Sequence, residues 1–253
     1  FSILKGKTKG LLLTGGEPTP SPLFPKTLTL ARQNGFVEIA VVTNGSFLDQ
    51  TEVEESLIQH ASTIRLSLYD WEKSTCNTFE SVLKKIESLR RKIDYTGSPL
   101  QIGVSALTAE KRSEKLQILA DTVRSAGAHW IYFHPLCTKW NIGRPTPKSQ
   151  EGILEKIREI QAQSGLNDRI FYSPERYKNF PLRFEKYHSA HFLLVVGADG
   201  VNYLGPEVKY HPRFVAADLT ESGIHHFLWN QSRTDFINSI RSHSYSAIRS
   251  RHR

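Results

Sequence analysis

The chain has 253 residues, of which 39% are hydrophobic, and its formal net charge is +8. This length suits one large domain, or one large domain with a small appendage. No apolar run reaches the roughly 20 residues that span a bilayer, so we expect no membrane partner. Cys76 and Cys137 are too few for a disulfide framework and too far apart for a close zinc-binding pair, which predicts a reduced, cytoplasmic setting.

Strand-like and helix-like segments alternate along the first part of the chain. Apolar or alternating stretches predict strands at 9–15, 36–45, 62–70, 100–107 and 129–136. Amphipathic stretches predict helices at 21–35, 49–61, 77–92, 111–127 and around 153–160. A helix after each strand predicts right-handed βαβ units and a parallel sheet. At this point both a doubly wound α/β sheet and part of a β/α barrel remain open.

Polar or glycine-rich residues stand where the predicted strands end, which is where parallel α/β sheets carry their functional residues. These ends carry TGGEP (14–18), TNG (43–45), Ser67, Ser105 and His134. In the first motif, Gly15 and Gly16 let the backbone approach a ligand closely, and Pro18 fixes the direction of the chain. Glu17 or a neighbouring carbonyl would then accept hydrogen bonds from a cationic amine.

Each of these features also has an ordinary structural interpretation. TGGEP alone is compatible with a plain strand-to-helix turn. Ser67 and Ser105 are compatible with solvent-facing positions on alternating strands, and His134 followed by Pro135 is compatible with a structural turn. The order of the whole set is more informative than any single member.

In that order the motifs resemble the radical SAM superfamily over about residues 8–136. TGGEP is similar to the family's GGEP motif, which holds the amino group of S-adenosylmethionine, and TNG is similar to the polar end of its next strand. The resemblance implies a partial (β/α)6 TIM-like barrel that lacks its first strand, over residues 1–165. It also implies an S-adenosylmethionine site formed by Gly15, Gly16, Glu17, Pro18, Thr43, Asn44, Ser67, Ser105 and His134.

The family's activity implies reductive cleavage of S-adenosylmethionine to a 5′-deoxyadenosyl radical, which abstracts hydrogen from a substrate. The implied partners are a small-molecule or peptide substrate and an electron donor such as flavodoxin or ferredoxin. No residue of this sequence is singled out as catalytic or as a metal ligand.

The sequence departs from the family at the cysteines. Radical SAM enzymes hold a [4Fe–4S] cluster with the thiolates of a C-x-x-x-C-x-x-C loop, which precedes GGEP. Cys76 and Cys137 both follow GGEP, and no such loop is present. We expect an N-terminally truncated enzyme that is inactive as this chain alone. The alternative is a pseudoenzyme without a cluster that binds a nucleoside-like ligand or a partner.

The predicted second domain, residues 166–253, is a small α+β extension. HFLLVVGADGVNYLGPEVKY (191–210) predicts a β-hairpin that turns at Asp199 and Gly200. It resembles the SPASM or twitch extension of radical SAM enzymes, but Leu204 and Gly205 stand where a cluster-binding cysteine would be. The basic tail at 241–253 offers a weaker alternative, binding of nucleic acid, which we do not favour over a solvated terminus.

Overall fold

The computed structural model describes residues 1–69, 79–135, 147–163, 169–177, 188–219 and 231–240. The chain divides into two compact units, one formed by residues 1–136 and 145–179 and the other by residues 137–144 and 180–253. Within the described residues, no helix is both long enough and apolar enough to cross a membrane.

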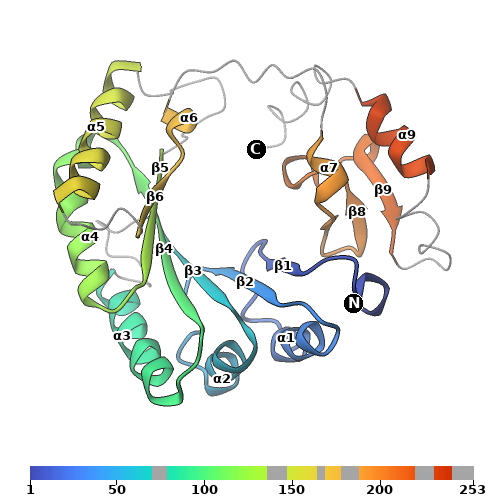
Figure 1. The fold of residues 1–253 in the computed structure, drawn as a ribbon, viewed down its shortest axis with the longest axis horizontal. Helices are drawn as coiled ribbons and strands as arrows, with labels where there is room; N and C mark the ends of the chain where they lie inside the picture. Colours follow the sequence, from blue (N-terminus) through green and yellow to red (C-terminus); the bar gives the residue numbers. More distant parts are fainter. Residues whose placement is uncertain (70–78, 136–146, 164–168, 178–187, 220–230, 241–253) are drawn as a thin grey trace. The chain divides into compact units, whose positions relative to one another are not determined.

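The first unit is built on one parallel sheet of six strands (Figure 1). Its strands are β1 (Gly10–Leu13), β2 (Glu38–Thr43), β3 (Thr63–Leu68), β4 (Gln101–Thr108), β5 (Trp130–Pro135) and β6 (Ile170–Tyr172). The spatial order of the strands is the same as their order in the sequence. The structure confirms the parallel sheet and adds β6, which the sequence did not predict.

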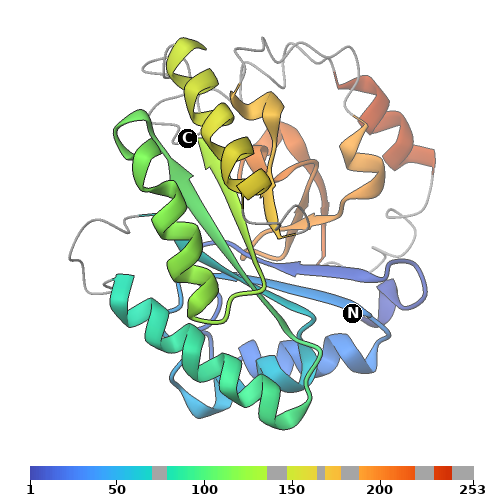
Figure 2. The same ribbon diagram turned by 60° about the vertical axis from the view of Figure 1, so that its left-hand side comes forward.

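Five helices cover the outer face of this sheet, as Figures 1 and 2 show from two directions. They are α1 (Phe24–Gln33), α2 (Thr51–His60), α3 (Phe79–Thr96), α4 (Leu116–Ser125) and α5 (Pro147–Gln163). A doubly wound sheet carries helices on both faces, whereas a β/α barrel carries them on the outside only. Sequential strand order with helices on one face therefore selects the partial-barrel arrangement.

Short helical turns complete this unit. A 3₁₀ turn, η1 (Ser2–Leu4), precedes β1, and another, η2 (Glu110–Lys115), leads into α4. After β6 follows the short helix α6 (Pro174–Tyr177). The first unit includes β6, because β6 pairs in parallel with β5.

Alternation along the strands sorts apolar and polar side chains onto opposite faces of the sheet. In β3, Ile64, Leu66 and Leu68 are buried in the core that the helices share. Arg65 and Ser67 lie on the opposite, inner face and are only partly buried. The inner face of β3 therefore presents two polar side chains, Arg65 and Ser67, near the C-terminal end of the strand.

Strand β1 is an edge of the sheet, since among the described residues it pairs only with β2. Its residue Leu12 is 54% exposed, and Leu11 and Leu13 are partly buried. The outer edge of β1 therefore leaves backbone donors and acceptors without a neighbouring strand.

The second unit contains a small antiparallel sheet of β7 (Val195–Val196), β8 (Val201–Tyr203) and β9 (Val215–Asp218). Strands β7 and β8 form the expected hairpin, in whose turn the Asp199 carboxylate accepts hydrogen bonds from the Val201 amide and the Tyr203 hydroxyl. The elements around this sheet are α7 (Ser189–Phe192), η3 (Pro206–Val208), η4 (Pro212–Phe214) and α9 (Gln231–Ser239). Leu204 packs in the core of this unit with Val208, Phe214 and Ile237. The basic tail at 241–253 lies outside the described residues.

Candidate functional site

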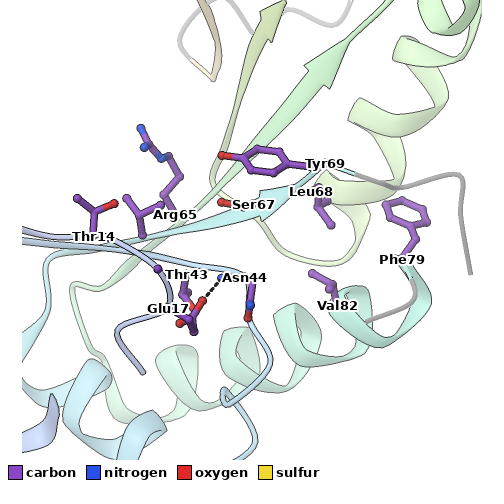
Figure 3. Close-up of a pocket in the computed structure, with 13 residues that line it drawn as sticks. Thr14, Glu17, Thr43, Asn44, Arg65, Ser67, Leu68, Tyr69, Phe79 and Val82 are labelled. Carbon is purple, nitrogen blue, oxygen red and sulfur yellow. Dashed lines mark hydrogen bonds between the residues drawn. The ribbon is translucent and has the colours of Figure 1, made fainter. Parts of the chain in front are cut away.

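A pocket of about 380 Å³ lies where β1, β2 and β3 end (Figure 3). The last residues of β2 and β3, the segments that follow β1, β2 and β3, and the start of α3 form its lining. Its lining residues are Thr14, Gly15, Gly16, Glu17, Val42, Thr43, Asn44, Arg65, Ser67, Leu68, Tyr69, Phe79 and Val82. The pocket thus lies at the carboxyl ends of the strands, which is where β/α barrels carry their functional sites.

The turn after β1 depends on glycine. Gly15 has a φ of +151°, a conformation that residues with a Cβ rarely adopt, and a Cβ built on Gly15 or Gly16 would meet no atom within 4 Å. Among the described residues, no group donates a hydrogen bond to the carbonyl of Gly15 or Gly16. Both carbonyls therefore stay available as acceptors for a donor that enters the pocket.

The Glu17 carboxylate is already bonded to the chain itself. Its Oε1 accepts hydrogen bonds from the Thr19 hydroxyl at 2.6 Å, the Thr43 hydroxyl at 2.5 Å and the Thr19 amide at 3.3 Å. Its Oε2 accepts one from the Asn44 amide at 2.6 Å, the bond drawn in Figure 3. Glu17 therefore joins the segment after β1 to the segment after β2, and the backbone carbonyls are the freer acceptors.

Arg65 contributes the positive charge of the pocket. Its Nε is buried and has no hydrogen-bond partner, and no carboxylate pairs with it among the residues that the structure describes. Figure 3 shows the side chain extending away from the Glu17 carboxylate. A partly buried guanidinium without a counter-charge is costly, so the pocket is suited to a ligand that brings an anionic group.

The rest of the wall is apolar or aromatic. Leu68 follows Ser67 in β3, and Phe79 and Val82 come from the first turns of α3. Tyr69 is 45% exposed and stands beside them in Figure 3. A ligand with polar and charged groups at one end and an apolar or aromatic body would match this division of the pocket.

Ser105 and His134 pair with each other and are not among the residues that line the pocket. The His134 Nε2 lies 3.0 Å from the Ser105 hydroxyl, and its ring stacks on Tyr132 and meets the edge of Tyr69. Burial, with the positive charges of Arg176 and Arg65 adding to it, lowers the pKa of His134 to about 4. The imidazole is therefore neutral near pH 7, and it contacts the pocket lining through the ring of Tyr69.

The structure thus brings most of the predicted site residues together. The pocket is lined by Gly15, Gly16, Glu17, Thr43, Asn44 and Ser67, but not by Pro18, Ser105 or His134. Sequence reasoning missed Arg65, although a signal was present: Arg65 stands two residues before Ser67 on an alternating strand, so both must share a face.

The described residues do not fit an iron–sulfur cluster. No group of three or more His, Cys, Asp or Glu side chains among them could hold a metal ion, and Cys76 and Cys137 lie outside the described residues. Such a cluster needs several thiolate ligands. No chemical step can be assigned to a cluster held by these residues.

A scan of the sequence against protein-family models found no match, and neither did a search of the curated proteins. Solved structures do match the fold. Streptococcus suis SuiB bound to S-adenosylmethionine aligns with a TM-score of 0.66 at 13% identity, over 96% of this chain and 60% of SuiB. SuiB bound to its precursor peptide SuiA aligns with a TM-score of 0.67 at 13% identity, over 92% of this chain and 56% of SuiB.

The protein anSMEcpe with bound AdoMet aligns with a TM-score of 0.64 at 16% identity, over 93% of this chain and 69% of anSMEcpe. At these identities the likeness shows a shared fold. The chain spans about 60% of the length of the SuiB structure that it matches.

Proposed function

We propose that this chain carries the S-adenosylmethionine-binding barrel of a radical SAM enzyme. The observation that carries the proposal is the pocket, whose lining includes Gly15, Gly16 and Arg65. Among the described residues, the two glycine carbonyls receive no hydrogen bond and no carboxylate pairs with Arg65. The methionyl part of S-adenosylmethionine has an amine and a carboxylate, which complement the glycine carbonyls and the arginine respectively. The shared fold with two proteins whose structures contain this molecule adds support.

In this proposal the carbonyls of Gly15 and Gly16 accept hydrogen bonds from the amine of the cofactor, and Glu17 holds the loop that presents them. Arg65 binds the carboxylate, because charge-assisted bonds to guanidinium are among the stronger ones available in proteins. Asn44 and Ser67 also line the pocket, and in this proposal they form hydrogen bonds to the ribose. Ser105 remains a predicted cofactor-binding residue, and His134 remains the residue predicted to lie beside the adenine.

The chemistry that S-adenosylmethionine supplies to this family is hydrogen abstraction from a substrate, after reduction by an iron–sulfur cluster. We propose that the cysteines for this cluster lie on a segment of the full protein that precedes this chain. The open edge of β1 supports the idea, because a further strand could pair there. The part of this barrel is to bind and orient the cofactor and to exclude water.

We also propose a peptide substrate and a SPASM-like role for the second unit. SuiB aligns with this chain and has been solved with its precursor peptide. The β7–β8 hairpin has the shape expected of such an extension, with Leu204 in its core in place of a cysteine. An electron donor such as flavodoxin or ferredoxin would complete the set of partners.

Calorimetric titration of the chain with S-adenosylmethionine tests the binding step. We expect one site, and an affinity that falls at least about tenfold in Arg65→Met, because a charge-assisted hydrogen bond contributes roughly 1.5–3 kcal/mol. Arg91→Met, a substitution of an exposed arginine on α3, is the matched control. The ligand 5′-methylthioadenosine lacks the amine and carboxylate, so Arg65→Met should leave its affinity unchanged. Absence of saturable binding by the wild-type chain would refute the proposal.

Anaerobic reconstitution of a longer protein, including the residues before Phe1, tests the enzymatic step. We expect the absorbance of a [4Fe–4S] cluster and reductant-dependent release of 5′-deoxyadenosine. Binding of S-adenosylmethionine without any cluster in that longer protein would instead support the cluster-free binding protein.

A further inference from the structure

Lys85 ties helix α3 to the turn that follows β2. Its ammonium donates hydrogen bonds to the carbonyl of Gly45 at 3.1 Å and to the carbonyl of Ser46 at 2.8 Å. The Lys85 side chain is 15% exposed, so these bonds are largely shielded from water. The Asp49 carboxylate lies 3.4 Å from the ammonium but is 66% exposed, and it contributes less.

The same turn is connected by hydrogen bonds to Glu17. The Gly45 amide donates to the Thr43 hydroxyl at 3.0 Å, and that hydroxyl donates to Glu17 Oε1. The Ser46 amide donates to Asn44 Oδ1 at 2.8 Å, while the Asn44 amide donates to Glu17 Oε2. A hydroxyl has one proton to donate, and here the direction of each bond is consistent with the next. A continuous series of hydrogen bonds thus runs from the Lys85 ammonium, through the turn, to the Glu17 carboxylate.

Lys85 also shares a helix with part of the pocket wall. Val82 lies one turn before Lys85 on α3, and Phe79 begins the helix. The two bonds of Lys85 therefore fix the distance between the apolar wall and the glycine loop. No other described side chain donates to the carbonyls of Gly45 and Ser46.

We infer that Lys85 is a positioning residue for the pocket: it holds the turn of residues 43–46, and through Glu17 it holds the Gly15 and Gly16 carbonyls in place. Lys85 itself does not line the pocket. Its effect on S-adenosylmethionine rests on the proposed function, whereas its effect on the turn does not.

Two measurements on the full chain separate these effects. Amide hydrogen exchange at Asn44 reports on the turn without any ligand, and calorimetric titration with S-adenosylmethionine reports on the pocket. The variants are Lys85→Met, which keeps the length of the side chain without its charge, and Lys85→Arg, which can still donate to both carbonyls. The neighbouring exposed lysine supplies the matched control Lys84→Met.

We expect Lys85→Met to speed exchange at Asn44 and to weaken S-adenosylmethionine binding, each by about tenfold, equivalent to about 1.4 kcal/mol. Lys85→Arg should bring the exchange rate and the affinity most of the way back to their wild-type values. Lys84→Met should match the wild type in both. Because methionine keeps most of the packing of the lysine stem, the loss in Lys85→Met reports on the two hydrogen bonds. If Lys85→Met does not fold, Lys85→Gln takes its place in both measurements.

The outcomes distinguish the two hypotheses. Unchanged exchange at Asn44 in Lys85→Met overturns the inference, whatever the ligand does. Faster exchange in a chain whose wild type binds no S-adenosylmethionine supports the inference about the turn and refutes the proposed function. Faster exchange with unchanged affinity in a binding-competent chain overturns the link from Lys85 to the pocket.

Discussion

Replacement of Glu17 tests whether this carboxylate supports the loop or binds the ligand directly. Three of its hydrogen bonds are short, those from the Thr19 hydroxyl at 2.6 Å, the Thr43 hydroxyl at 2.5 Å and the Asn44 amide at 2.6 Å. Glu17→Ala removes all three acceptor contacts. Glu17→Gln keeps one oxygen for the Asn44 amide but points an NH₂ group at hydroxyls that now donate.

The expected cost follows from the number of bonds. A hydrogen bond to a charged group contributes roughly 1.5–3 kcal/mol when fully buried. Glu17 is only partly buried, so about 1 kcal/mol per short bond is a fair value, and Glu17→Ala should lose about 3 kcal/mol of unfolding free energy. Glu17→Gln should lose about half as much, because it keeps the bond geometry at Asn44 and gives up the charge.

Urea unfolding of the two variants measures these losses, with Glu55→Gln, an exposed glutamate of α2, as the matched control. S-adenosylmethionine affinity is measured on the same samples. If Glu17 supports the loop, stability and affinity fall together from Gln to Ala. A Glu17→Gln variant with wild-type stability and no affinity would refute this reasoning, because it would identify Glu17 as a direct ligand of the amine.

Two further predictions concern the inner face of the sheet. A Cβ at Gly103 would lie 2.0 Å from Trp130 Cζ2, so Gly103→Ala should cost about 1–3 kcal/mol of unfolding free energy in urea titrations. Gly152→Ala, in α5 with no atom within 4 Å of its Cβ, should instead stabilise by about 0.5–1 kcal/mol. Burial lowers the pKa of His134 to about 4, whereas the ordinary histidine pKa of 6.5 applies in the unfolded chain. As the pH falls below 6.5, the unfolded chain therefore takes up the proton first. Stability should therefore drop between pH 6.5 and 4 more steeply in wild type than in His134→Gln; equal slopes would contradict this.

Much of the fold of the first unit follows from periodicity. The alternating segment predicted at 62–70 contains β3, and the apolar stripe of Phe79, Val82 and Ile86 lies in α3. Strand β6 could not be found this way, because three residues are too few to show an alternation, and Phe171 at its centre is 46% exposed. The choice between a barrel and a doubly wound sheet depended on strand order, which no local pattern contains.

The parts of the candidate site that are local sequence motifs could be predicted. The parts that depend on how the strands align with one another could not. The glycines of TGGEP and the TNG turn are local features, and they do meet at one pocket. The guanidinium of Arg65 was missed although its face could be read from Ser67, because alternation does not show that a side chain lacks a carboxylate partner among the described residues. Glu17 was visible in the sequence, but its bonds to Thr43 and Asn44 join residues that lie far apart in the chain.

The hydrogen bonds of Glu17 are all donated by groups of the chain itself, and this has a consequence for the speed of binding. A loop that must fold around its ligand adds a slow step, so the observed association rate levels off at high ligand concentration. A loop that is already held by its own hydrogen bonds adds no slow step, and the observed association rate then rises in proportion to the ligand concentration. The turn between β1 and α1 should therefore receive its ligand in a single encounter.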